Sequence, residues 1–378
     1  MIVKQLNKYS WVFLVALVVA LVLAKWMLLV AILGLALLIT VHEFGHFAAA
    51  KLFGMRVEKF YVGFPPAAAK KRWGETEYGI GLIPLGGFCK ISGMTPEEKV
   101  PKGTGERTYR AKPAWQRNVT IFAGPLMNFV AAVVIFFAFI EAQGLITPTL
   151  TLQSVVPTVM VNGVSVRTPA AIAGLQPGDT LIAANGVRWT DWTQAQAYFH
   201  ANAGRTFTLA YRTSAGSEMT ARVTLMANPD DAKLGFLGVQ AGTRADRPLP
   251  WRGAWLALTG TGQSIALTFK GIWWLITGKI SATGPNGVAG PVGIVRISET
   301  AVQQHLYPLL LVFLSVNLGI INLLPILPFD GGHIFFTTLE AVRGRRVDTR
   351  VLERVVTVGT VLLVTLFVLI TYLDIRRL

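Results

Sequence analysis

The sequence predicts a polytopic α-helical membrane protein with four to five transmembrane helices and an inserted α+β domain. Of its 378 residues, 52% are hydrophobic and only 15% are charged, whereas about a quarter of the residues in a soluble domain carry a charge. Apolar runs of about 20 residues, the length that crosses a bilayer, recur along the chain. Between two of these runs lies a segment of short β-rich pieces separated by turn signals.

The charge distribution predicts which loops lie in the cytoplasm. The net charge is +15, and residues 51–117 hold 13 Lys or Arg against 6 Asp or Glu, whereas residues 147–250 hold 8 against 6. A Lys/Arg excess in loops next to membrane spans marks the cytoplasmic side. We therefore interpret the basic charge as membrane topology and not as nucleic-acid binding. Cys89 is the single cysteine, so no intramolecular disulfide can form.

Residues 11–53 form an almost continuous apolar run. As one helix this run would measure roughly 65 Å, about twice the thickness of a bilayer core. Either two spans meet at Lys25 and Trp26, or one long helix projects beyond the membrane. The first piece also resembles the apolar part of a signal peptide, but no small-residue cleavage site follows it. We expect an extra span with a cytoplasmic N-terminus.

Changes in composition along the chain predict its domains. We expect an extra span in residues 1–25, the N-terminal half of a membrane core in residues 26–146, the inserted domain in residues 147–245, an amphipathic interfacial segment with a linker in residues 246–304, and the C-terminal half of the core in residues 305–378.

Three segments of the membrane core carry more specific expectations. We expect the second span at about residues 118–144, with Gly124 and Pro125 loosening its start. The Trp-rich segment 251–280 has basic residues spaced through an apolar stretch, which favours an interfacial helix, with a full span as the alternative. A last span covers about residues 351–373.

The stretch LLITVHEFGHFAAAKLF, residues 37–53, places three ionisable groups inside an apolar helix. Such groups are costly at membrane depth unless they are paired, bind a metal or face water. In this HExxH pattern, His42 and His46 share one helix face and can reach one metal ion, while Glu43 can approach a water on that metal. Zinc lowers the pKa of such a water to about 7. The structural alternative is a polar seam between two helices.

A catalytic zinc site needs a third protein ligand and one open position. The candidates are the carboxylates and the remaining histidines, His200, His305 and His333. Asp330 is the only acid in residues 306–339, and the prolines and glycines around it predict an unwound helix there. Unwound backbone at membrane depth lines a cavity or is buried in protein, which suits a ligand. His333 is either an alternative ligand or a neighbour that hydrogen-bonds near the site.

Five motifs occur together in the chain: HEFGH, LIPLGGFCKISGM, GPLMNF, GPVGI and NLLPILPFDGGH. Together they resemble the site-2 protease family of intramembrane zinc metalloproteases, closest to its bacterial RseP type with a single PDZ domain. The resemblance covers nearly the whole chain from about Leu28 onward. The family usually has leucine where this chain has Phe329, and the closest type often has two PDZ domains in tandem.

The resemblance implies one Zn²⁺ ion held by His42, His46 and Asp330, with Glu43 as the general base. It further implies that Asn322, at the head of the N-x-x-P pattern, contacts the substrate backbone or the developing oxyanion. The other residues expected on the substrate side are Asn128, in a supporting role, Gly86 and Gly87.

Two further segments resemble parts of that family. Residues 170–194 read as a helix, a strand, a tight NG turn and a new helix capped by Asp191, similar to the core of a PDZ domain outside the membrane. Such a domain either captures peptides or filters substrates by size, and we expect the filter. Residues 78–94 are Gly-rich and β-branched and resemble the family's re-entrant hairpin. Its edge strand would pair with an unwound substrate, or the hairpin is purely structural.

These observations predict a zinc metalloendopeptidase that cuts within transmembrane segments of single-span proteins, such as anti-sigma factors or signal-peptide remnants. The expected partners are transmembrane protein substrates and the lipid bilayer, with no nucleic acid. We expect a multi-pass protein of the bacterial inner membrane with the PDZ domain on the extracytoplasmic side. The alternative is a non-catalytic membrane adapter that uses its PDZ domain, which would be expected to lack one of His42, Glu43, His46 and Asp330.

Overall fold

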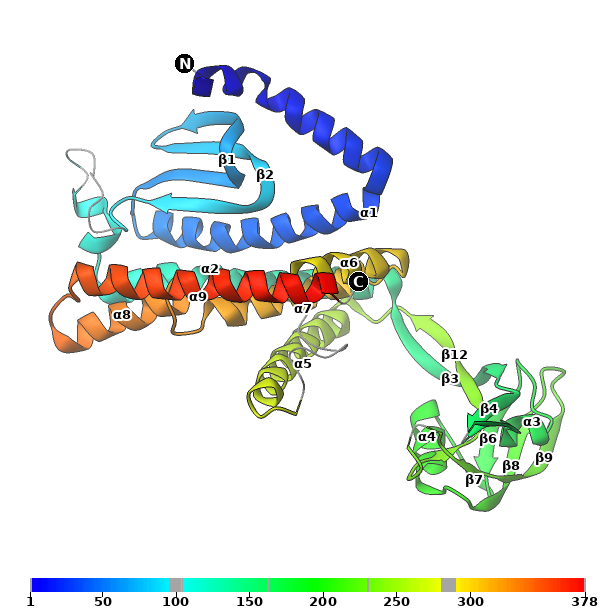
Figure 1. Ribbon diagram of the computed structural model, residues 1–378. Coiled ribbons are helices and arrows are strands. Elements are labelled where there is room, and N and C mark those ends of the chain that lie inside the picture. Colours follow the sequence, from blue (N-terminus) through cyan, green and yellow to red (C-terminus); the bar gives the residue numbers. More distant parts are fainter. Residues whose placement is uncertain are drawn as a thin grey trace. The chain divides into compact units, whose positions relative to one another are not determined.

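The computed structural model describes residues 2–94, 103, 105–161, 163–229, 231–279 and 290–376 (Figure 1). Most of the predicted Gly/Pro-rich linker, residues 280–289, lies outside these ranges. The chain divides into two compact units. One combines Met1–Phe139 with Pro250–Leu378, and the other is Ile140–Leu249.

Helices dominate the first unit. In the described part of the chain, three are long and apolar enough to cross a membrane: α1 (Ile2–Leu52) from Trp26 onward, α2 (Ala114–Gln143), and α9 (Thr349–Arg376) from Arg350 onward. The shorter apolar helix is α7 (Tyr307–Asn322). The remaining helices are α5 (Pro250–Ile276), α6 (Pro291–Gln303) and α8 (Asp330–Arg343). This is a membrane protein by the length and composition of its helices.

Helix α1 is continuous through Lys25 and Trp26, where the composition places the boundary between two apolar pieces. Helix α2 starts earlier than expected, so Gly124 and Pro125 lie inside it and do not loosen its start. Close packing between the two helices explains a glycine in this region. A Cβ atom on Gly45 would lie 2.1 Å from the carbonyl oxygen of Ala123, so only glycine lets the backbones approach this closely.

A bent β-hairpin follows α1 and lies along its second half (Figure 1). Its strands are β1 (Val57–Trp73) and β2 (Thr76–Ile91). Both strands fold back, so that residues 59–64 pair with residues 77–83 on one side, and residues 57–62 pair with residues 87–91 on the other. The sequence predicts only the β2 part of this hairpin, and β1 is missed.

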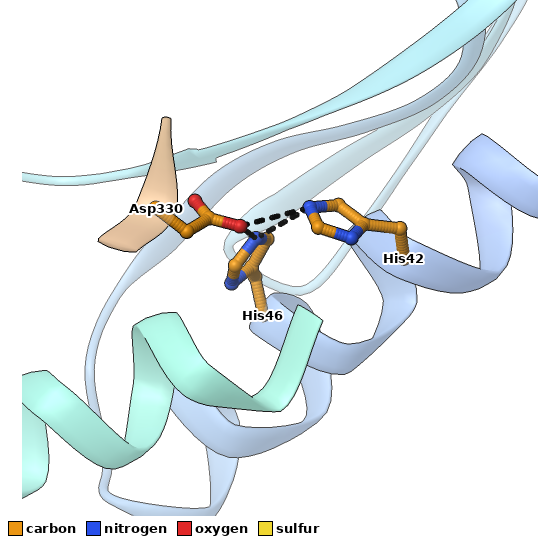
Figure 2. Close-up of side chains that lie close together, drawn as sticks. All are labelled: His42, His46 and Asp330. Atoms are coloured by element: carbon orange, nitrogen blue, oxygen red, sulfur yellow. Dashed lines mark hydrogen bonds and ion pairs between the residues drawn. The ribbon is translucent and has the colours of Figure 1, made fainter. Parts of the chain in front are cut away.

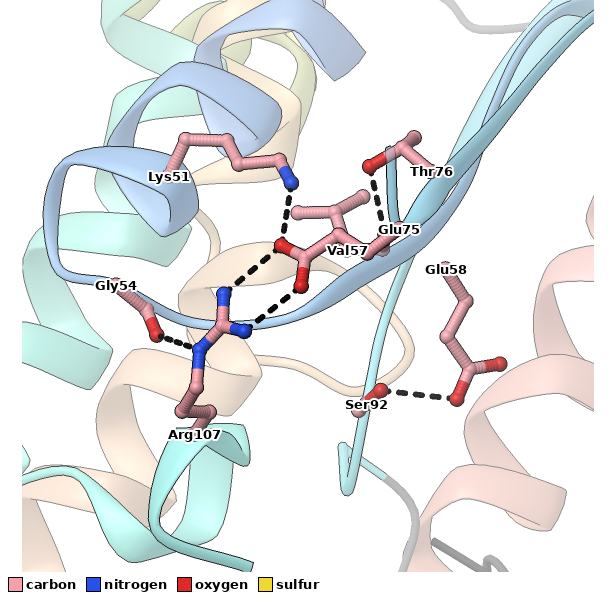
Figure 3. A network of polar contacts seen from close by, with 8 residues as sticks. All are labelled: Lys51, Gly54, Val57, Glu58, Glu75, Thr76, Ser92 and Arg107. Atoms are coloured by element: carbon pink, nitrogen blue, oxygen red, sulfur yellow. Dashed lines mark hydrogen bonds and ion pairs between the residues drawn. The ribbon is translucent and has the colours of Figure 1, made fainter. Parts of the chain in front are cut away.

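Polar contacts attach the hairpin to the end of α1 (Figure 3). The Glu75 carboxylate, in the β1–β2 turn, accepts a hydrogen bond from Lys51 Nζ at 2.7 Å. It also accepts two from the Arg107 guanidinium at 2.8 and 2.9 Å, a bidentate pair of the stronger kind. Arg107 Nε donates to the Gly54 carbonyl oxygen. The turn is therefore tied to the segment that connects α1 to β1.

The second unit is an α+β domain built on an antiparallel sheet with the strand order β12-β3-β6-β8-β9. These strands are β3 (Leu145–Val155), β6 (Thr180–Ala184), β8 (Thr206–Arg212), β9 (Glu218–Thr224) and β12 (Val239–Asp246). Shorter strands are β4 (Thr158–Val161), β5 (Val164–Arg167), β7 (Val187–Arg188), β10 (Met226–Ala227) and β11 (Gly235–Phe236).

Local signals in the second unit behave as the sequence predicts. Helix α3 (Pro169–Ile172) precedes β6, and Asn185 and Gly186 form the tight turn into β7 with positive φ angles of 49° and 83°. Asp191 caps α4 (Trp192–Ala201), because its side chain accepts a hydrogen bond from the Gln194 amide.

Candidate metal centre

The HExxH stretch lies on α1, and both of its histidines point the same way. His42 and His46 are four residues apart, so one helical turn stacks their side chains on one face. Their Nε2 atoms are 3.2 Å apart, and the rings meet edge to face. Both residues are buried, with 6% and 8% of their surface exposed.

Asp330 reaches the same point from the other half of the chain. Helix α7 ends at Asn322, the backbone is non-helical from Leu323 to Phe329, and α8 begins at Asp330. The helix break predicted around Asp330 therefore lies just before it. Gly331 and Gly332 are helical, and their role is close approach, because a Cβ atom on Gly331 would lie 2.2 Å from the Leu323 carbonyl oxygen.

The three side chains form a compact triangle of donor atoms (Figure 2). Asp330 Oδ2 lies 3.0 Å from His42 Nε2 and 3.4 Å from His46 Nε2. Zinc ligands stand about 2.0 Å from the ion, so two of them at tetrahedral positions are roughly 3.3 Å apart. The spacing of these three atoms thus fits one zinc ion.

The buried carboxylate oxygen Oδ2 of Asp330 also supports a metal site. Asp330 Oδ2 has no hydrogen bond of acceptable geometry within the described part of the chain, although its ion-pair distance to His42 is short. A buried carboxylate oxygen without a donor is costly. A cation between the three atoms would satisfy it, and two neutral imidazoles with one carboxylate are a ligand set that suits zinc.

Helix α2 closes one side of this centre. A Cβ atom on Gly124 would lie 2.4 Å from both Cε1 and Nε2 of His46 and 2.9 Å from Cε1 of His42. The absent side chain leaves room for the two rings. His46 Nδ1 lies 2.9 Å from the carbonyl oxygen of Thr120, and His42 Nδ1 lies 3.0 Å from the side-chain amide of Asn128.

Glu43 lies beside the centre and is held by the hairpin. Its Oε2 atom accepts a hydrogen bond of 2.8 Å from the backbone amide of Cys89. Gly87 belongs to the same strand, and a Cβ atom there would lie 3.7 Å from Glu43 Cγ. The strand that contains both predicted glycines, Gly86 and Gly87, therefore runs next to the carboxylate. This backbone contact to Glu43 has no signal in the sequence.

The other predicted site residues do not belong to the group of three donor atoms. In the residues that the structure describes, the one group of side chains with metal-ligand geometry is that of His42, His46 and Asp330. His333 lies half-buried on α8, one turn after Asp330, and His200 belongs to the second unit. Asn322 is the last residue of α7 and makes no side-chain hydrogen bond within the described ranges.

Comparison with known proteins places this geometry in a family. The model of peptidase family M50 matches residues 30–366, which include all three candidate ligands. The chain belongs to peptidase family M50. A protein of Nostoc sp., named a candidate zinc metalloprotease, is 32% identical over 349 residues, which are 89% of this chain and 93% of the relative.

Further M50 relatives carry the same description. The proteins of Synechocystis sp. and Clostridium acetobutylicum are 31% and 29% identical to this chain. Each covers 92% of this chain, and the alignments span 93% and 97% of the relatives. The predicted family and enzyme class, a metalloendopeptidase with a zinc cofactor, are confirmed, and the M50 chain has a ligand set that fits that ion.

Proposed function

We propose that this M50 peptidase hydrolyses peptide bonds inside the transmembrane segments of single-span proteins. The carrying observation is the convergence of three ligand atoms within 3.4 Å of one another, from a membrane helix and from a broken helix about 290 residues later. We assign His42, His46 and Asp330 as the ligands of one zinc ion. A hydrolytic centre of this kind in apolar helices suits substrates that are themselves membrane-embedded.

The side chains around the ion divide the chemistry among them. Zinc, when bound, polarises the scissile carbonyl and makes a water more acidic. Glu43 takes the proton from the attacking water and passes it to the leaving nitrogen, and the Cys89 amide holds its carboxylate in place. Asn322 donates a hydrogen bond to the substrate carbonyl as negative charge develops on its oxygen.

We assign the outer edge of the hairpin, formed by residues 87–91, as the site where the substrate backbone pairs. Residues 87–91 pair with residues 57–62 on one side only, and this edge runs beside Glu43. A transmembrane helix hides its peptide bonds in its own hydrogen bonds, so it must unwind before cleavage. An unwound segment that pairs with this edge by strand addition places its backbone next to Glu43, and we assign Gly86 and Gly87 of the same strand to the substrate side.

The second unit acts as a PDZ-like size filter in this proposal, on the extracytoplasmic side of a bacterial inner membrane. The basic segment 51–117 supports this topology, because it would lie in the cytoplasm. Suitable substrates are proteins already trimmed of their outer domain, such as anti-sigma factors, and signal-peptide remnants.

Cleavage of a single-span substrate by the purified full-length protein tests the general base and the ligands. We expect the wild type to cut inside the membrane segment, and Glu43→Gln to retain zinc but lose the general-base contribution, typically 10²–10⁴-fold in rate. Asp330→Asn should lower both bound zinc and cleavage. Glu299→Gln on α6 is the matched control for a change of carboxylate to amide and should leave both unchanged.

Equal cleavage by wild type and Glu43→Gln would show that Glu43 is not the base. Full zinc occupancy in Asp330→Ala, which has no ligand oxygen, would exclude Asp330 as a ligand and direct attention to His333. A wild type that neither binds zinc nor cuts any single-span substrate would favour the non-catalytic adapter.

A further inference from the structure

Helix α2 presents one face to both histidines of the metal centre. Thr120, Gly124 and Asn128 are spaced four residues apart, so they line up along one side of the helix. The first contacts His46, the second leaves room for both rings, and the third contacts His42. Asn128 is fully buried, at 0% exposure, so it lies within protein and not on a surface that a substrate reaches.

The contact between Thr120 and His46 determines the tautomer of the His46 ring. Thr120 offers a backbone carbonyl oxygen, which can only accept a hydrogen bond. His46 Nδ1 therefore carries the hydrogen, and the lone pair of Nε2 points towards His42 and Asp330. A hydrogen bond of this kind on the second ring nitrogen orients most metal-binding histidines.

His42 needs the same arrangement, and Asn128 is the residue that can provide it. The amide nitrogen of Asn128 faces His42 Nδ1 at 3.0 Å, while its Oδ1 atom is buried without a partner in the described ranges. A half-turn of the amide exchanges these two atoms and moves nothing else. Oδ1 then accepts a hydrogen bond from His42 Nδ1–H, and His42 Nε2 presents its lone pair to the ion.

We propose, on the basis of the zinc ligands assigned above, that Asn128 is a positioning residue whose side-chain oxygen holds His42 in the metal-binding tautomer. It acts through His42 and does not touch the substrate. Helix α2 sets the backbone position of Asn128, and Ser315 Oγ of α7 adds one hydrogen bond of 2.8 Å to its backbone carbonyl oxygen, which does not involve the amide. The backbone and side-chain contacts of Asn128 can therefore be tested separately.

The test is zinc affinity, measured by competition with a chelator, in purified full-length variants. Asn128→Leu keeps the shape but cannot accept a hydrogen bond, and we expect an affinity about 10–100-fold below that of the wild type. Asn128→Asp can only accept, so it supports the required tautomer and should keep the wild-type affinity or exceed it. Ser315→Ala, the matched control, removes the backbone contact and should leave zinc affinity unchanged.

Two further readouts separate positioning from a general loss of structure. Thermal unfolding of the chelator-treated proteins should be similar for the wild type and Asn128→Leu, whereas a purely structural role would lower the melting temperature without changing the affinity of folded protein. Cobalt substitution should give an altered ligand-field spectrum in Asn128→Leu and a wild-type spectrum in Asn128→Asp.

Wild-type zinc affinity in Asn128→Leu would overturn the role of Asn128. So would a loss in Asn128→Asp as large as that in Asn128→Leu, because the amide would then act as a donor or by packing. If Asn128→Leu does not fold, the aspartate variant still decides between acceptance and donation. A wild type without zinc would overturn the zinc site itself, which distinguishes that failure from a failure of Asn128 alone.

Discussion

Gly124 shows how one missing side chain shapes the metal centre. The atoms nearest to a Cβ at this position belong to the rings of His46 and His42, the two proposed histidine ligands. Neither ring can move away freely, because His46 is fixed by Thr120 and His42 lies against Asn128. At the scale of single residues, close backbone approach and hydrogen-bonded rings together set the ligand positions.

Gly124→Ala should therefore weaken zinc binding. We expect overpacking of about 1–3 kcal/mol and a displacement of His46 that disturbs the ligand triangle. Zinc content per protein and the melting temperature in detergent are the measurements. Gly271→Ala on α5 is the control, because nothing lies within 4 Å of its Cβ position, and it should keep zinc. Full zinc binding by Gly124→Ala would show that α2 can move away.

The hairpin is the element that contacts Glu43, the proposed general base, which itself lies on α1. Its edge strand holds Glu43 through Cys89, while its turn is held by Lys51 and Arg107 (Figure 3). Between these two attachments the strands pair with each other and pack on α1. A weaker attachment at the turn would loosen the strand that holds Glu43, the proposed general base.

The turn attachment should depend on pH in a definite direction. The hydrogen bonds from Arg107, followed by those from Lys51, lower the pKa of Glu75 below its ordinary value near 4.5. A lowered folded-state pKa adds stability above the unfolded pKa, and this stability is lost as the pH falls through the folded value. Since the partners are partly exposed, the contribution is at most about 1 kcal/mol.

Glu75→Gln should accordingly unfold at a lower temperature than the wild type near neutral pH, and the difference should shrink as the pH falls below about 4.5. Thermal unfolding in detergent across this range measures it, with Glu299→Gln as the control. A difference that is constant with pH would mean that the charge of Glu75 does not contribute.

At the scale of the whole molecule, the division into two units implies that the second unit can fold by itself. The second unit has its own core, in which Leu209, Leu181 and Phe207 are almost completely buried. A domain of about 100 residues buries enough apolar surface to fold alone. The first unit in turn contains all the candidate zinc ligands and Glu43, the proposed general base.

Residues 144–249 should therefore fold as an independent soluble fragment. Within it, Leu209→Ala removes a side chain with 0% exposure and should cost about 2–5 kcal/mol of unfolding free energy. Val187→Ala, at a position that is 68% exposed, should cost much less. Urea unfolding followed by circular dichroism measures both. A fragment without a cooperative transition would show that the second unit needs the membrane core.

Strand β1 and the role of two glycines were not predicted, because the local composition of each segment favours a different structure. Strand β1 contains two prolines and a run of basic residues, which argue against a strand when the sequence is read locally. It exists because β2 pairs with it on both sides of a bend. In the same way, Gly331 and Gly332 suggest an unwound backbone, but tight packing against residues 323–327 is the actual reason for them.

The candidate zinc ligands could be predicted from local features of the sequence. Helical spacing puts His42 and His46 on one face, and Asp330 is conspicuous as the lone acid of an apolar run. The contacts of Thr120, Asn128 and Cys89 with these groups could not be read there, because they join segments that are 40 or more residues apart. Such contacts depend on how helices and strands pack, and packing is a property of the folded chain and not of any one segment.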